Sequence, residues 1–135
     1  MTFEFEIENI VKLVLIFVLG GIVGVEREVK VKPAGLRTHI LVGMASTLLT
    51  ILGLEAFPGS DQARIAAAVV LGMGFVGAGA ILKTENKISG LTTAASLWIT
   101  SAIGITIGTG YYILAIVTTA LTYICLKLSI FSQSE

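Results

Sequence analysis

A stretch of 39 residues, from Ile88 to Leu126, contains no Asp, Glu, Lys, Arg or His. A bilayer core about 30 Å thick is crossed by roughly 20 helical residues, so this stretch is long enough for two crossings. Gly108-Thr109-Gly110, near its middle, is suited to a turn, and Tyr111 and Tyr112 after it are residue types that favour the membrane–water interface. The stretch therefore predicts an integral membrane protein whose first partner is the lipid bilayer.

The overall composition supports a membrane protein. Hydrophobic residues make up 55% of the 135 residues and charged residues 13%, and the mean hydropathy is +0.94. A soluble domain of this size needs more polar surface. The formal net charge is zero, which gives no reason to expect a nucleic-acid partner. No cleavable signal peptide is expected, because acidic residues replace the basic start that such a peptide needs: Glu4, Glu6 and Glu8.

Hydropathy predicts an all-α membrane protein, because backbone polar groups that face lipid must be hydrogen-bonded within their own segment. The expected spans of this five-helix transmembrane bundle are residues 9–25, 38–54, 64–82, 91–108 and 111–127. The connections are short, so residues 1–135 are expected to form a single transmembrane domain without a soluble C-terminal domain. Small residues on two faces of the third span predict a central position for it, and Trp98 is expected to pack inside the bundle.

The distribution of Lys and Arg predicts the orientation. The first and third connections and the far end of the chain are basic, and the alternate connections are not, apart from Arg64 at the start of the third span. By the positive-inside rule, the N-terminus lies outside the cell and the C-terminus inside. The residues that decide this are Arg27, Lys30, Lys32, Arg37, Lys83, Lys87 and Lys127.

Two segments of the chain resemble each other. Residues 35–38 (GLRT) open the second span and residues 90–93 (GLTT) open the fourth, and Gly53 and Gly108 close these spans at the same distance. The similarity predicts a parallel repeat in which spans one and two correspond to spans three and four, as in some transporters. The alternative is chance recurrence of small residues in a helical bundle.

The connection between the first two spans is the densest polar stretch. Its carboxylates, Glu26 and Glu28, are candidate ligands for a hydrated Mg²⁺, which needs only one or two carboxylates. The connection nevertheless carries more basic than acidic groups, which favours an ion pair between Glu26 and Lys30 and basic contacts to lipid headgroups. The candidate functional residues in this stretch are Glu26, Arg27, Glu28, Lys32, Arg37, Thr38 and His39.

Asp61 and Arg64 form a second candidate group, at the outer start of the third span. Asp61 is placed to cap this helix near its positive end, and the alternative is that Arg64 is a gate charge. No nucleophile with a partnered base, no metal-ligand spacing and no cofactor loop occurs in the chain. We therefore expect no enzymatic activity, no catalytic residue and no bound cofactor.

Five blocks in order along the chain resemble the membrane domain of the MgtC/SapB family. They are residues 24–28 (GVERE), 32–39 (KPAGLRTH), 61–67 (with Asp61 and RIAA from Arg64), 74–79 (GFVGAG) and 90–98 (GLTTAASLW). The resemblance implies a five-span protein of a prokaryotic cytoplasmic membrane, linked to growth at low magnesium and to survival inside host cells. It also implies an action on the F-type ATP synthase or, in a disputed alternative, Mg²⁺ transport.

Two function classes follow. The first is a small regulator linked to magnesium homeostasis and membrane energetics, which acts through contacts that include ATP synthase membrane subunits. The second is a small cation transporter or channel, suggested by the repeat. A small bundle with glycine-lined faces also predicts a homodimer, with Gly20 and Gly24 or the fifth span at its interface.

Overall fold

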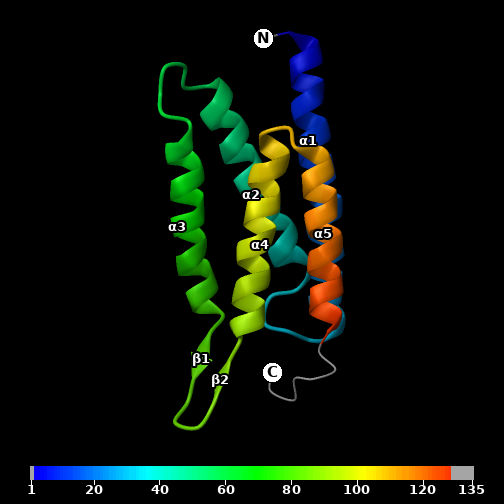
Figure 1. Cartoon of the computed structure of the whole chain (residues 1–135), viewed down its shortest axis with the longest axis vertical. Helices are drawn as coiled ribbons and strands as arrows, with labels where there is room; N and C mark the ends of the chain where they lie inside the picture. Colours follow the sequence, from blue (N-terminus) through cyan, green and yellow to red (C-terminus); the bar gives the residue numbers. More distant parts are fainter. Residues whose placement is uncertain (1, 129–135) are drawn as a thin grey trace.

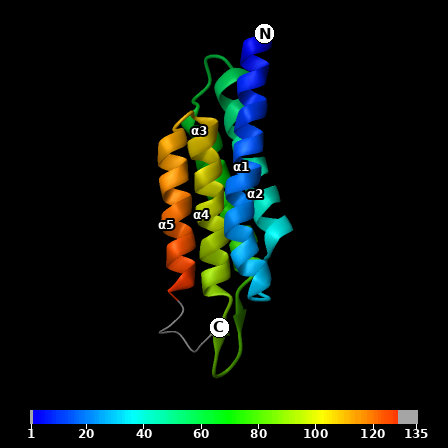
Figure 2. The ribbon, with the colours of Figure 1, turned by 90° about the vertical axis from the view of Figure 1, so that its right-hand side faces the viewer.

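The computed structural model describes residues 2–128, which form five helices and one short hairpin (Figure 1). The helices run side by side along the long axis of the molecule (Figure 2), and the all-α class predicted from the sequence is confirmed. The elements are α1 (Phe3–Val29), α2 (Leu36–Glu55), α3 (Ala63–Gly79), β1 (Leu82–Lys83), β2 (Ile88–Ser89), α4 (Leu91–Gly108) and α5 (Tyr112–Lys127).

Three of these helices, α1, α2 and α4, are long and apolar enough to cross a membrane. The other two, α3 and α5, are apolar helices of 17 and 16 residues. Helix α3 ends at Gly79, so the predicted span over residues 64–82 was too long at its end. The residues that follow pair as the antiparallel strands β1 and β2, which extend beyond the helices (Figure 1). The Thr84 amide closes their turn by donating to the Lys87 carbonyl at 2.8 Å.

Helix α4, not α3, is the centre of the bundle. It contacts each of the other four helices, whereas α3 packs mainly on α4. The prediction of a central third span was wrong because three of its glycines, Gly72, Gly74 and Gly79, face open space: a Cβ atom at any of them would meet nothing within 4 Å. Trp98 lies on the bundle surface with 47% exposure, which corrects the prediction of an interior position. Lipid tails are as apolar as the interior of the bundle, so an apolar side chain is equally stable on the lipid-facing surface.

Helices α2 and α4 approach each other closely. A Cβ atom on Gly104 would overlap Ser46 Oγ and lie 2.6 Å from the Gly43 carbonyl oxygen. The Thr47 hydroxyl donates to the Gly104 carbonyl at 3.0 Å across the same contact. Small residues let the two backbones approach, and the interhelical hydrogen bond then becomes possible.

Gly20 and Gly24 of α1 pack inside the chain, against the start of α2. A Cβ atom on Gly24 would lie 2.8 Å from Leu36 Cα, and one on Gly20 would lie 3.2 Å from the His39 carbonyl oxygen. These glycines are therefore buried within one copy of the chain, and their predicted place at a dimer interface was wrong. The homodimer itself stays a prediction.

The predicted repeat has a partial counterpart in the helix contacts. Gly24 of α1 faces His39 of α2, and Gly77 of α3 faces Ala94 of α4, which are corresponding positions in the two halves. The α1–α2 connection contains no strands, in contrast to the hairpin between α3 and α4. The repeat therefore stays a prediction.

Candidate functional site

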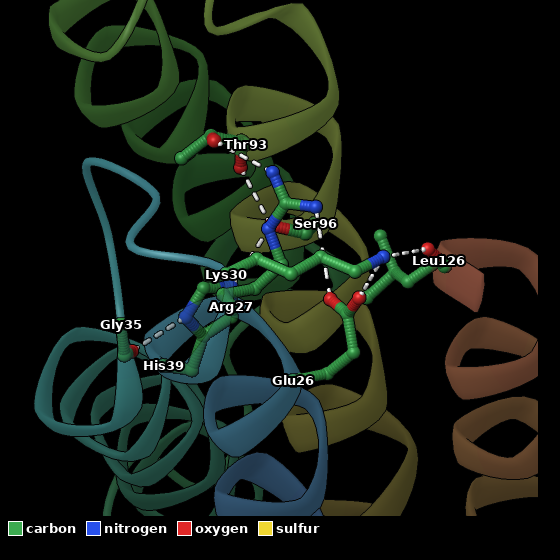
Figure 3. A network of polar contacts seen from close by, with 8 residues as sticks. All are labelled: Glu26, Arg27, Lys30, Gly35, His39, Thr93, Ser96 and Leu126. Carbon is green, nitrogen blue, oxygen red and sulfur yellow. Dashed lines mark hydrogen bonds and ion pairs between the residues drawn. The ribbon is translucent and has the colours of Figure 1, made fainter. Parts of the chain in front are cut away.

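A cluster of buried charged and polar side chains lies at the end of the bundle where α1 finishes (Figure 3). Helix α1 continues to Val29, four residues beyond its predicted end, and the residues at its end bring Arg27 into contact with α4 and Lys30 into contact with α5 (Figure 3). Both residues are only 2% exposed, and His39 on α2 is completely buried. Charged groups in such a position are stable only when they are paired.

Glu26 is the only acid in this buried cluster, and two cations lie beside it. Its Oε1 atom is 2.5 Å from Lys30 Nζ, and its Oε2 atom is 3.7 Å from Arg27 Nη1. The Glu26–Lys30 pair predicted from helical spacing is therefore confirmed. Lys30 Nζ also donates to the Leu126 carbonyl at 2.9 Å, which fastens the last turn of α5 to α1.

Arg27 and His39 connect this cluster to α4. Arg27 Nη2 donates to Thr93 Oγ1 at 3.0 Å, and His39 Nε2 lies 2.9 Å from Ser96 Oγ. His39 Nδ1 is 2.8 Å from the Gly35 carbonyl oxygen, which can only accept, so Nδ1 carries a proton. The cluster thus joins the end of α1, the start of α2 and the start of α4 through side-chain hydrogen bonds.

Glu28 belongs to a different contact. Its Oε2 atom accepts a hydrogen bond from the Leu36 amide at 2.9 Å, which satisfies a free N–H group at the start of α2. Residues two apart on a helix point about 200° from each other, so Glu26 and Glu28 do not converge. Among residues 2–128, no three His, Cys, Asp or Glu side chains lie close enough to hold a metal ion. The geometry therefore favours the ion-pair alternative for Glu26.

The other predicted residues are spread over both ends of the bundle. The Lys32 amide donates to the Arg27 carbonyl at 3.0 Å, whereas Arg37 and Thr38 are exposed on the first turn of α2. Asp61 and Arg64 lie at the opposite end, where Asp61 Oδ1 accepts from the Ala63 amide at 3.0 Å. Asp61 thus binds the first amide of α3 from one position before the N-cap residue, Gln62, which makes no side-chain capping bond itself.

Sequence reasoning did not predict Thr93 and Ser96 as partners of the charged residues. Both side chains are buried, at 0% and 2% exposure. The available signal was the recurrence of GLTT at residues 90–93, which marked this segment as equivalent to the charged start of the second span.

The family model of MgtC, described as "MgtC family", matches residues 13–133. The chain belongs to the MgtC family. Of the five sequence blocks that resemble this family, three meet at the buried cluster: residues 24–28, 32–39 and 90–98. Most of the sequence blocks that resemble the family therefore lie at the end of the bundle that contains Glu26, Arg27 and His39.

Several curated MgtC-family relatives are similar to this chain. YhiD of Escherichia coli (strain K12), whose name marks it as a candidate magnesium transporter, is 45% identical over 135 residues, or 94% of this chain and 61% of its own length. SapB of Bacillus subtilis (strain 168) is 40% identical over 76% of this chain and 48% of its own length. MgtC of Brucella abortus (strain 2308) is 40% identical over 70% of this chain and 40% of its own length.

The chain spans about three fifths or less of the length of these relatives. No solved structure matches it. The comparisons therefore support the family, a membrane protein and a link to magnesium.

Proposed function

We propose that this MgtC-family chain is a regulator linked to magnesium homeostasis and membrane energetics, which acts through contacts with other membrane proteins and not by catalysis. The observation that carries this proposal is the pairing of the buried polar groups with one another. Glu26 is held by Arg27 and Lys30, and His39 by Gly35 and Ser96. Polar groups that are paired with one another hold helices together, and few of their atoms are left to bind an ion that crosses the membrane.

The hydroxyl groups in the middle of the bundle support the same interpretation. Ser46 and Thr50 donate to carbonyl groups of their own helix at 3.1 and 2.7 Å, and Thr100 does so at 2.7 Å. They lie along the contact between α2 and α4, where Gly43, Gly104 and Gly108 face side chains or backbone of the opposite helix. An ion path would need such groups to face a water-filled cavity.

Membrane subunits of the F-type ATP synthase are the partner that the family resemblance suggests. The test is co-purification of the affinity-tagged chain from native membranes in a mild detergent, with the ATP synthase subunits quantified by mass spectrometry. We expect these subunits to be enriched relative to a tagged unrelated five-span protein at the same expression level. Repeated absence of enrichment would contradict the proposed partner.

The alternative function is transport, with Mg²⁺ as the substrate, and the name of the YhiD relative favours it. We expect proteoliposomes that contain the chain to take up Mg²⁺ no faster than protein-free vesicles, measured with an enclosed fluorescent indicator. Uptake above that background that saturates with Mg²⁺ would replace the regulator proposal by a transporter.

The orientation is part of the proposal and has its own test. Asn86, in the turn between β1 and β2, and Ser60, between α2 and α3, lie at opposite ends of the bundle (Figure 1). In a Cys125→Ser background, we expect Ser60→Cys to react with a membrane-impermeant maleimide on intact cells. Asn86→Cys should react only after the cytoplasmic face is opened. The reverse pattern would overturn the proposed placement of the buried cluster near the cytoplasm.

A further inference from the structure

An apolar groove with a volume of about 660 Å³ runs between α2 and α3. The two helices touch at one end, where a Cβ atom on Gly53 would lie 2.9 Å from Ile65 Cδ1. Farther along, α3 leans on α4, where Met73 packs in the same cluster as Leu97. The groove is the space left as α3 diverges from α2.

Small residues form the floor of this groove and one charged side chain lies at its mouth. Ala45, Ala68 and Gly72 line it, and a Cβ atom on Gly72 would meet nothing within 4 Å. Arg64 lines the end nearest the α2–α3 loop and is exposed. The described part of the chain gives the Arg64 guanidinium neither an ion pair nor a hydrogen bond. The groove is thus apolar along its length and positive at one end.

The length of the groove matches one leaflet of a bilayer. Val76, at its far end, follows Arg64 by twelve positions on α3, which is about 18 Å along a helix. Half of a hydrocarbon core about 30 Å thick is about 15 Å. Arg64 therefore lies at the level of the headgroups when the far end of the groove lies near the bilayer midplane.

The lining of the groove favours a lipid acyl chain as its occupant. Ten of its twelve lining residues are apolar or glycine, and the two polar ones are Ser46 and Arg64. An acyl chain attached to an anionic headgroup matches a groove that is apolar along most of its length and positive at one end.

We propose that the α2–α3 groove binds a single phospholipid from the leaflet at the N-terminal end of the bundle. One acyl chain lies on the small-residue floor, and the Arg64 guanidinium binds the phosphate. Guanidinium groups bind phosphate oxygens through two hydrogen bonds at once, and the positive charge complements the anionic lipid. This site is independent of the proposed regulatory function, since it lies at the opposite end from the buried charged cluster.

The test is native mass spectrometry of the purified chain released from nanodiscs that contain phosphatidylglycerol. We expect one retained lipid per wild-type chain, and an occupancy at least tenfold lower for Gly72→Leu, which adds a side chain at a groove-lining position where a Cβ atom would meet nothing within 4 Å. The matched control is Gly74→Leu on the same helix, which also faces open space but does not line the groove. It should retain the lipid as the wild type does.

Two further experiments distinguish binding of the headgroup from binding of the acyl chain, and one of them uses only the wild-type protein, so it does not depend on the folding of a variant. Arg64→Gln should lower phosphatidylglycerol occupancy several-fold and leave diacylglycerol occupancy unchanged, whereas Arg64→Lys should retain most of the phospholipid. In the wild type, photolysis of a phosphatidylglycerol with a diazirine in its acyl chain should label peptides of α2 and α3 more than those of α5.

Three results would overturn the proposal. The first is equal lipid occupancy in the wild type and Gly72→Leu. The second is equal labelling of α3 and α5. The third is a lipid-free dimer that Gly72→Leu abolishes, which would assign the groove to a second copy of the chain.

Discussion

Gly104→Ala should destabilise the protein by about 1–3 kcal/mol, the usual cost of adding a methyl group to a well-packed contact. In an isolated helix the same change is favourable by about 1 kcal/mol. The sign reverses here because the new Cβ atom would overlap Ser46 Oγ and approach the Gly43 carbonyl oxygen to 2.6 Å. A backbone atom cannot turn aside as a side chain can, so α2 and α4 must separate. The 3.0 Å hydrogen bond from Thr47 to the Gly104 carbonyl is then stretched. The measurement is thermal or denaturant unfolding in a fixed detergent.

The matched control for this prediction is Gly74→Ala. A Cβ atom on Gly74 meets nothing within 4 Å, so helix propensity alone should act and the variant should be at least as stable as the wild type. Ser46→Ala added to Gly104→Ala should recover part of the loss, since it removes the hydroxyl and leaves the Gly43 carbonyl in place. Equal stability of Gly104→Ala and Gly74→Ala would show that the α2–α4 contact is looser than described.

Hydropathy predicted the helices well because crossing a bilayer constrains length and composition strongly. The fourth span was predicted over residues 91–108, and α4 runs over Leu91–Gly108. The order of the helices in the bundle was predicted poorly, because a glycine marks a missing side chain and does not reveal what lies opposite. Gly72 faces open space and Gly104 faces another backbone, yet both are glycines in apolar helices.

In the candidate site, a contact within one helix was predicted from the sequence and the contacts between helices were not. The Glu26–Lys30 pair was predictable because both residues lie on one helix, four positions apart. The contact between Arg27 and Thr93 joins residues 66 positions apart, and that between His39 and Ser96 joins residues 57 apart. Such contacts depend on how closely α1 and α2 approach α4, which hydropathy does not determine. The polar character of the site was therefore readable from the sequence, and its connection to α4 was not.

Glu26→Gln should be the most damaging change in the charged cluster, with a loss of about 3–5 kcal/mol in unfolding free energy, the usual result of removing one partner from a buried ion pair. The Glu26 carboxylate is completely buried and is the single acid beside two cations, Arg27 and Lys30. A neutral amide leaves Arg27, which is 2% exposed, without a compensating charge. We expect a lower yield of folded protein and a lower midpoint of unfolding at constant detergent concentration.

Glu28→Gln is the matched control for this last prediction, because Glu28 is exposed and its Gln amide oxygen can still accept from the Leu36 amide. It should cost less than about 1 kcal/mol, in the range of a single exposed hydrogen bond. The double variant Glu26→Gln/Lys30→Met should lose less than the sum of the two single changes, since it removes one of the two cations that Glu26 balances. If Glu26→Gln were tolerated as well as Glu28→Gln, the buried carboxylate would not be balancing Arg27, and the charged cluster would not hold α1 against α4.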